Sequence, residues 1–209
     1  MTFLFDFDGT LVDSMPVYAK MIYDLLDECG IHYTPDILKI TTPLGHAGTA
    51  KLMVEMGAER TAEELLAQLH SRALEDYTWH IGEKPGVGAA LRRLKAAGHS
   101  LNVLTASPHV CLDPCLQRLG LWDLFDNVWS CDDFGTTKSD PEIYRMAAAR
   151  LGCAAEDVVF LDDNYNADKT AGDAGMTVWG VYDESSADME EDIRAVTHRY
   201  IRSFDELVN

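Results

Sequence analysis

The chain has 209 residues, of which 47% are hydrophobic and 25% charged, as in water-soluble globular proteins. Its formal net charge of −18 argues against binding to nucleic acid or to an anionic membrane, because both need basic patches. No apolar run approaches the roughly 18 residues of a membrane span, and the start, MTFLFDFD, lacks the features of a signal peptide. The five cysteines, an odd number, suit a reducing compartment. We expect a cytoplasmic protein, as a monomer or weak dimer.

The first predicted strand covers residues 3–5, a short apolar segment that stops at polar residues. It is followed by a long stretch, residues 15–80, that shows only helical patterns. Among them are VYAKMIYDLLDECG and TAEELLAQLHSRALEDY, whose apolar residues recur at helical spacing. About 65 helical residues inserted after a first strand predict a separate, all-helical cap domain.

Strands and helices alternate in the rest of the chain. Strands are predicted at residues 100–104, 128–129, 158–161 and 177–181, and helices over PGVGAALRRLKAAG and DPEIYRMAAARLG. This alternation indicates βαβ units and an α/β fold, a parallel sheet with helices on both faces. The predicted organisation is a Rossmann-like core at residues 1–14 and 81–209, with the helical cap at 15–80.

Two pairs of aspartates follow predicted strands. Asp6 and Asp8 lie on one side of the first strand, because side chains alternate with period two, and Asp162 and Asp163 end the strand at 158–161. Parallel strands bring their carboxyl ends together, so four carboxylates are expected to converge and to require a cation. Turn capping would account for only one of them. Oxygen ligands without histidine or cysteine favour Mg²⁺.

Groups that can bind a phosphoryl oxygen occur at two other strand ends. Thr105 supplies a hydroxyl and is followed by Ala106 and Ser107, while Lys138 stands just before a predicted helix. A hydroxyl, loop amides, a lysine and Mg²⁺ together can bind the equatorial oxygens of a transferring phosphoryl group. Each residue alone is weak evidence, but the ordered set predicts phosphoryl chemistry.

The ordered motifs DFDGTLVDS, LTAS, Lys138 and FLDDN resemble those of the haloacid-dehalogenase-like superfamily. The resemblance covers the whole chain, since the cap insertion of that family falls where the helical segment lies. Within this superfamily, the chain resembles the capped branch that includes phosphoglycolate phosphatases and β-phosphoglucomutases. It implies a Rossmann-like core, Mg²⁺-dependent phosphoryl transfer and an aspartyl-phosphate intermediate.

The resemblance also implies individual roles. Asp6 corresponds to the nucleophile, and Asp8 to the general acid and base, whose backbone carbonyl would also meet the metal. Thr105 corresponds to the residue that orients the phosphoryl group, and Lys138 to the one that neutralises it. The metal ligands would then be Asp6, Asp8, Asp162 and Asp163, with Asp162 either ligating directly or fixing Lys138 and metal-bound water.

Two positions depart from the family pattern. Lys138 is followed by Ser139-Asp140-Pro141, where many relatives have proline at once, and Asp162 stands where many have glycine. Neither change removes a catalytic group, so we interpret both as variation within the family.

The resemblance leaves three activities to weigh. A dehalogenase has no alkoxide to protonate, so Asp8 and the second acidic pair favour a phosphatase. A β-phosphoglucomutase-like mutase is the alternative, but Gly48 stands where that branch carries an arginine for the second phosphate. A non-catalytic binding paralogue usually lacks the nucleophile or the acid, and both are present here.

The substrate is predicted only as a small phosphorylated metabolite, such as a sugar phosphate or phosphoglycolate. In capped relatives, specificity comes from residues near a hinge-like glycine, which here are Gly45, His46 and Lys51. The loop after the second strand offers Ser107 and His109 as contacts to the leaving group. The side chains of His46, Lys51, Ser107 and His109 can equally be solvated at the surface.

Overall fold

A computed structural model describes residues 1–208 of the chain. The strands are β1 Thr2–Phe5, β2 Ser100–Thr105, β3 Asn127–Ser130, β4 Val158–Asp162, β5 Thr177–Val181 and β6 Arg199–Ile201. The α-helices are α1 Met15–Glu28, α2 Ile37–Glu55, α3 Ala62–Trp79, α4 Val87–Ala96, α5 His109–Arg118, α6 Pro141–Leu151, α7 Tyr165–Asp173 and α8 Glu190–Val196. Short 3-10 turns are η1 Trp122–Leu124, η2 Cys131–Asp133, η3 Ala155–Asp157, η4 Glu184–Met189 and η5 Phe204–Val208.

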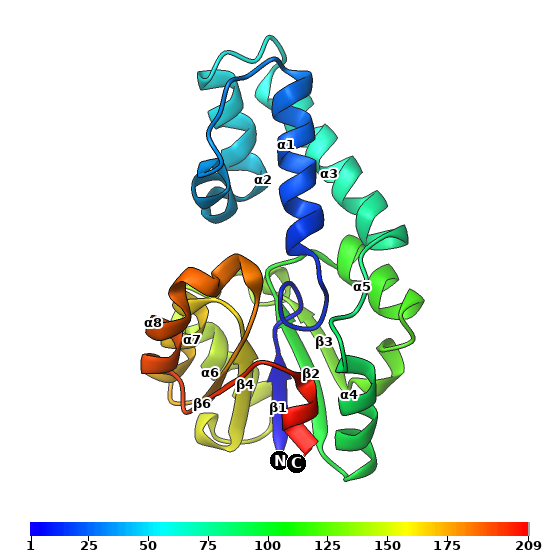
Figure 1. Ribbon diagram of the computed structural model, residues 1–209. Helices are drawn as coiled ribbons and strands as arrows, with labels where there is room; N and C mark the ends of the chain where they lie inside the picture. Colours follow the sequence, from blue (N-terminus) through cyan, green and yellow to red (C-terminus); the bar gives the residue numbers. More distant parts are fainter. Residues whose placement is uncertain (209) are drawn as a thin grey trace. The chain divides into compact units, whose positions relative to one another are not determined.

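The chain divides into two compact units. One unit, which we call the core unit, contains residues 1–13 and the chain from residue 82 onward; the other, the helical unit, contains residues 14–81. All strands belong to the core unit, where they form one parallel sheet in the order β3-β2-β1-β4-β5-β6. Helices α4 and α5 lie on one side of the sheet, and α6, α7 and α8 on the other (Figure 1). The predicted Rossmann-like α/β fold is confirmed.

The strand order reverses at the centre of the sheet, between β1 and β4. The chain moves outward from β1 through β2 to β3, and then returns to the other side of β1 to form β4. In open α/β sheets such a switch point, at the carboxyl ends of the strands, is where ligands bind. Phe5 pairs with both Val103 and Leu161, so Asp6 and Asp162 follow at the same level of the sheet.

The core on one face of the sheet joins alternate strand residues to α6 and α7. Leu4 and Phe160 point to this face and are fully buried against Tyr144 and Ala171. The rings of Tyr144 and Phe160 meet edge to face, with centroids 5.1 Å apart, and the Tyr144 hydroxyl donates to the carbonyls of Lys138 and Ala167 at 3.2 Å each. This packing fixes the segment that carries Lys138 against the end of β4.

Helices α6 and α7 begin at side chains that cap them. Asp140 accepts a hydrogen bond from the Glu142 N–H, Pro141 occupies the first turn, and α6 ends at Gly152 in the left-handed region. Asn164 accepts from the N–H groups of the first turn of α7. The predicted helix over DPEIYRMAAARLG therefore has its expected boundaries. The segment FLDDN contains both the end of β4 and, at Asn164, the N-cap of α7.

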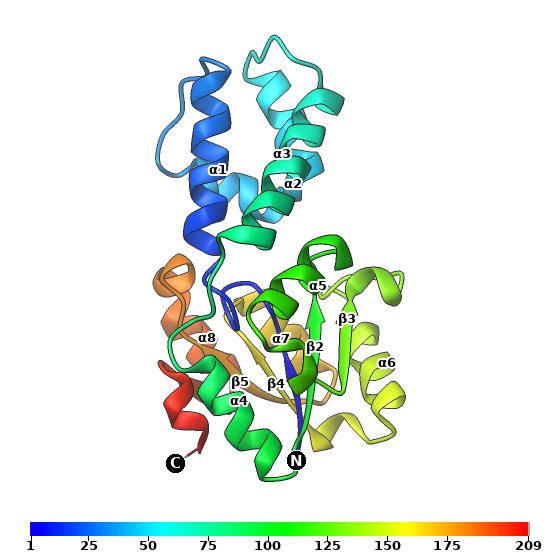
Figure 2. The same cartoon turned by 90° about the vertical axis from the view of Figure 1, so that its right-hand side faces the viewer.

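The helical unit consists of α1, α2 and α3, joined to the core unit by two chain crossings (Figure 2). Its own core is built around Ile22, Leu25, Met53 and Leu69, all fully buried. Helix α3 starts with a reciprocal capping box of Thr61 and Glu64. Both patterns read as helices in this segment are helical in the structure.

Two features of the fold differ from the sequence expectation. Strand β6 was not foreseen, because only Ile201 of its three residues is an aliphatic side chain that faces the core. Helix α2 contains a kink at Gly45, whose φ of 61° and ψ of −178° are not helical. Within residues 1–208, no helix is both long enough and apolar enough to cross a membrane.

Candidate active site

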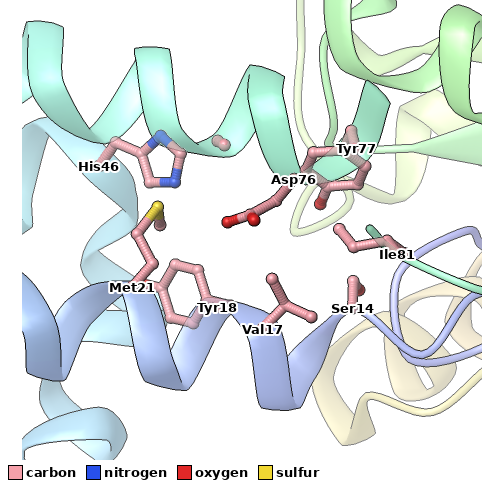
Figure 3. A pocket seen from close by; sticks show the side chains of 9 residues that line it. Ser14, Val17, Tyr18, Met21, His46, Asp76, Tyr77 and Ile81 are labelled. Carbon is pink, nitrogen blue, oxygen red and sulfur yellow. The ribbon is translucent and has the colours of Figure 1, made fainter. Parts of the chain in front are cut away.

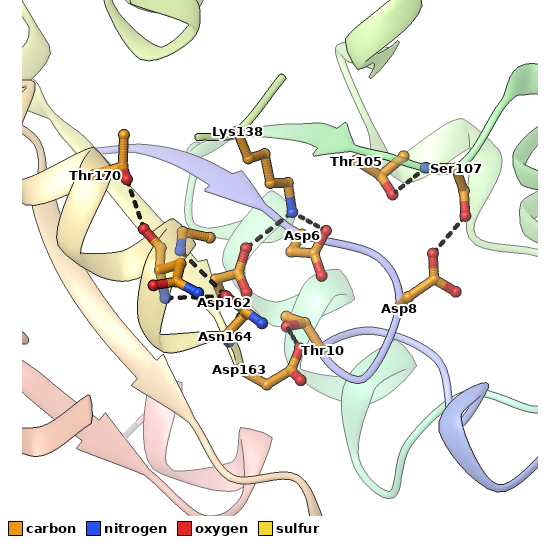
Figure 4. Close-up of polar contacts among 12 residues, drawn as sticks. Asp6, Asp8, Thr10, Thr105, Ser107, Lys138, Asp162, Asp163, Asn164 and Thr170 are labelled. Carbon is orange, nitrogen blue, oxygen red and sulfur yellow. Dashed lines mark hydrogen bonds and ion pairs between the residues drawn. The ribbon is translucent and has the colours of Figure 1, made fainter. Parts of the chain in front are cut away.

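Asp6 and Lys138 form a buried ion pair at the switch point. Lys138 Nζ donates to Asp6 Oδ1 and, at 2.8 Å, to Asp162 Oδ2 (Figure 4). The Lys138 side chain is 14% exposed, and those of Asp6 and Asp162 are 7% and 1% exposed. The cation from the segment before α6 thus bridges the carboxylates that follow β1 and end β4.

Asp163 is held from the opposite side by the turn after β1. Its Oδ1 accepts a hydrogen bond from the Thr10 hydroxyl at 3.0 Å. A Cβ at Gly9 would lie 2.6–2.7 Å from the Asp163 carboxylate, and the φ of Gly9 is +75°. Glycine is therefore required at this position, both for the turn and for the approach of the carboxylate. Thr10 was missed as a supporting residue because its hydroxyl reads as an ordinary turn residue.

Asp6, Asp162 and Asp163 form a cluster that can hold a metal ion. They offer oxygen atoms that all lie within 4.8 Å of one another, and all three residues are buried. Burial raises the pKa of Asp6 to about 8 in the metal-free protein, against the lowering effect of Lys138. Burial and the charge of Asp162 raise the pKa of Asp163 as well. Lys138 pairs with two of these three carboxylates, so their negative charge is only partly neutralised. Such a cluster of carboxylate oxygens fits a hard divalent cation.

The carboxylate of Asp8 is not part of this cluster. Its Oδ2 accepts a hydrogen bond from the Ser107 hydroxyl at 2.6 Å, on the side of β2 (Figure 4). Three carboxylates, rather than the four expected from the sequence, therefore group around a common point. The reason is that β1 ends at Phe5, so the period-two alternation does not extend into the turn that holds Asp8.

The other predicted phosphoryl-binding residues lie at the end of β2. Thr105 is buried and its Oγ1 accepts from the Ser107 N–H at 3.0 Å, while Ala106 is exposed. His109 lies at the start of α5 with both ring nitrogens next to carboxylates, Nδ1 2.7 Å from Asp113 and Nε2 2.8 Å from Asp133. The structure thus gives His109 protein partners rather than the open position of a leaving-group contact.

The three predicted cap residues belong to α2 in the helical unit. Gly45 and Lys51 are exposed, whereas His46 is half-buried and stacks on Tyr18 with ring centroids 6.1 Å apart. His46 lines a cavity of about 30 Å³, enough for roughly one water, together with Tyr18 of α1 and Asp76 of α3 (Figure 3). Burial raises the pKa of Asp76 above its ordinary value.

Lys84 is a supporting residue that the sequence did not indicate. Its Nζ donates to the carbonyls of Gly9 and Tyr182, at 2.5 and 2.6 Å, and to Asp183 Oδ2 at 2.8 Å. These bonds fix the turn after β1 to the segment after β5. The sequence around Lys84 belongs to no motif of the predicted site, and the partners of its side chain come from distant parts of the chain.

The family of haloacid dehalogenase-like hydrolases matches residues 1–175, and the chain belongs to this family. The pyrophosphatase PpaX of Bacillus velezensis is 30% identical over 180 residues, which cover 85% of this chain and 81% of that protein. A phosphorylated carbohydrates phosphatase of Thermotoga maritima is 29% identical over 180 residues, covering 85% and 83%. A crystal structure from Thermotoga maritima, of a candidate β-phosphoglucomutase, has a TM-score of 0.83 and 26% identity, and covers 100% of this chain and 96% of that one. The predicted superfamily and the prediction of a phosphatase-type hydrolase are confirmed.

Binding of a divalent cation is expected to stabilise the protein against heat. At a concentration 100 times the Kd, a cation bound only by the folded state adds about 2.7 kcal/mol, which raises Tm by about 5–10 °C for a chain of this size. Differential scanning fluorimetry with and without the cation measures this. Asp163→Asn should lose most of the increase, whereas the exposed control Asp123→Asn should keep it.

The increase in Tm should depend on pH. The pKa of Asp6 is raised from 3.8 to about 8, so the folded metal-free protein holds a proton that the unfolded chain has lost. Stability without metal therefore falls as the pH rises from about 4 to about 8. Because the cation and the proton compete for the cluster, the increase in Tm should be larger at pH 8 than at pH 6. An equal increase at both pH values would contradict the assignment of the site to these carboxylates.

Proposed function

We propose that this enzyme is a Mg²⁺-dependent phosphatase that hydrolyses a small phosphomonoester through a phosphoryl group carried by Asp6. The observation that supports it best is the buried arrangement of Asp6, Lys138, Asp162 and Asp163 at the switch point of the sheet. A carboxylate is a weak nucleophile, but it becomes effective when its position and its surroundings are fixed.

The residues proposed to hold Mg²⁺ are Asp6, Asp8 through its backbone carbonyl, Asp162 and Asp163. When bound, the ion would neutralise negative charge on the phosphate ester and polarise its P–O bonds. Both oxygens of Asp162 already accept hydrogen bonds, Oδ2 from Lys138 and Oδ1 from the Asn164 N–H at 2.8 Å. These hydrogen bonds favour a main role for Asp162 in holding Lys138 in place.

The proposed reaction has two steps. In the first, an Asp6 oxygen bonds to phosphorus while the ester P–O bond breaks, and Asp8 gives a proton to the leaving oxygen. In the second, Asp8 takes a proton from water, the water oxygen bonds to phosphorus, and the bond to Asp6 breaks to release phosphate. Thr105 orients the phosphoryl oxygens, and Lys138 balances their charge.

The proposed substrates are small phosphate monoesters of the sugar phosphate or phosphoglycolate type. The likeness to a phosphorylated carbohydrates phosphatase supports the first of these. Substrate contacts are proposed from Ala106 and Ser107 of the core unit and from Gly45, His46 and Lys51.

We also propose that residues 15–80 are a cap domain and that 1–14 with 81–209 are the catalytic core. A cytoplasmic monomer or weak dimer that binds neither nucleic acid nor membrane completes the proposal.

A phosphomutase is the second candidate, because the matched Thermotoga maritima structure is of a candidate β-phosphoglucomutase. A mutase must grip a second phosphate with a cation, and Gly48 cannot supply one. Phosphate release without a bisphosphate activator would support the phosphatase. Interconversion of glucose 1-phosphate and glucose 6-phosphate faster than phosphate release would support the mutase. A protein without turnover on any ester would be the non-catalytic binding paralogue.

Removal of metal should abolish activity. A screen of phosphorylated metabolites with Mg²⁺, which reads released phosphate, should find a substrate whose hydrolysis stops in EDTA and resumes with excess Mg²⁺. Ca²⁺ should inhibit, because its larger and less rigid coordination lets a carboxylate bind through both oxygens and withdraws Asp6 from attack. Full activity after chelation and removal of tightly bound metal would refute the metal requirement.

A further inference from the structure

The loop between β2 and α5 makes a direct contact with the proposed acid. Ser107 donates its N–H to Thr105 Oγ1 at 3.0 Å and its hydroxyl to Asp8 Oδ2 at 2.6 Å (Figure 4). One serine thus connects two residues of the proposed reaction. A carboxylate at the end of a flexible side chain can rotate, and a short hydrogen bond from a neighbouring hydroxyl restricts it to one orientation.

The same loop is anchored by His109, two residues further on. Its Nδ1 lies 2.7 Å from Asp113 of α5 and its Nε2 lies 2.8 Å from Asp133 of η2. Ionised carboxylates only accept hydrogen bonds, so the two contacts favour the protonated ring, in which both nitrogens donate. These hydrogen bonds raise the pKa of His109 above its ordinary value.

Asp133 is itself fixed in place. Its Oδ2 also accepts from the N–H of Ser130 at 2.9 Å, and Ser130 pairs with Thr105 in the sheet. Arg150 of α6 donates to the Asp133 carbonyl at 2.8 Å and stacks on Phe134. His109 therefore links the loop after β2 to the rigid end of β3.

We propose that His109 is a positioning residue, which clamps the loop after β2 so that Ser107 orients the Asp8 carboxylate for proton transfer. The inference rests on the proposed phosphatase function. The alternative, direct contact of His109 with the leaving group, would need a ring nitrogen that the carboxylates now occupy. The side chains of His109, Asp113 and Asp133 are each about one-third exposed, and ion pairs this exposed contribute little to stability. A variant at His109 should therefore fold.

The test compares two classes of ester with His109→Asn and Ser107→Ala. Values of kcat/KM report the steps up to departure of the leaving group, so hydrolysis of the phosphoenzyme does not enter. For an alkyl phosphate, whose leaving oxygen needs a proton, kcat/KM should fall by about tenfold to hundredfold. For 4-nitrophenyl phosphate, whose leaving oxygen is far less basic, it should fall by less than about threefold. The exposed control His32→Asn should match the wild type on both esters.

Two further measurements separate positioning from general damage. In an Asp8→Asn background, His109→Asn should add less than about a twofold loss, and its effect should not add to that of Ser107→Ala. An unchanged kcat/KM, an equal loss on both esters, or a loss that persists in the Asp8→Asn background would overturn the positioning role alone. A wild-type protein that releases phosphate from no ester would overturn the proposed function and this inference with it. Thermal melting identifies any variant that fails to fold, in which case the conservative Asp113→Asn replaces it.

Discussion

Asp6→Asn is expected to lower kcat by about four orders of magnitude or more, while the protein still folds. Loss of the nucleophile in an enzyme that reacts through a covalent intermediate removes nearly all chemical catalysis. An amide oxygen is a poor nucleophile and cannot carry a phosphoryl group as the carboxylate would. The fold should persist, because Lys138 keeps its bond to Asp162 and the neutral asparagine adds no negative charge to a crowded cluster.

Released phosphate measures this loss, and a mass spectrum of rapidly quenched protein shows whether a phosphoryl group is attached. The wild type should carry one on the peptide that contains Asp6, and the variant should carry none. Asp123→Asn, at an exposed position outside the site, serves as the matched control and should retain full activity. Substantial turnover by Asp6→Ala, in which no side-chain oxygen remains, would eliminate Asp6 as the nucleophile.

The parts of the site that follow from strand register could be predicted from the sequence. Asp6 and Asp162 each come one residue after paired positions of neighbouring parallel strands, so a correct assignment of the strands places them together. Lys138 could be placed near them because it precedes α6, which leads into β4. These inferences need only the period of a strand and the direction of its neighbours.

The parts that depend on turns could not be predicted in this way. The side chain of Asp8 departs from the alternation because β1 has ended, and its partner Ser107 lies 99 positions along the chain. Lys84 likewise bonds to two carbonyls and a carboxylate that come from both ends of the chain. Residues of this kind carry no local pattern, since only the folded structure brings their partners together.

Lys138→Met is expected to reduce both activity and stability. We expect kcat/KM to fall by about a thousandfold, because the developing charge on the phosphoryl oxygens loses a buried cation. Removal of one partner from a buried ion pair costs about 3–5 kcal/mol, since the buried carboxylate of Asp162 is then left unpaired. The control is Lys169→Met on α7, which breaks an exposed ion pair with Asp173 and should cost little stability without affecting turnover.

The dependence of this stability loss on pH distinguishes lost charge pairing from lost packing. Lys138 lowers the pKa of Asp6, so without the lysine the carboxyl keeps its proton to a higher pH than about 8. Below that pH, Asp6 is protonated in both metal-free proteins, so the loss of stability comes from the broken pair with Asp162 and from lost packing. As the pH rises, Asp6 of the wild type ionises beside Lys138. In the variant, Asp6 either ionises without a partner or stays protonated at a pH where the unfolded chain has lost the proton, and both states lower the stability of the fold. Urea unfolding in EDTA should therefore give a larger difference between wild type and variant at pH 9 than at pH 6. A difference that is the same at both pH values would mean that the pairing of Lys138 with Asp6 does not contribute to stability, which leaves its pairing with Asp162 and its packing.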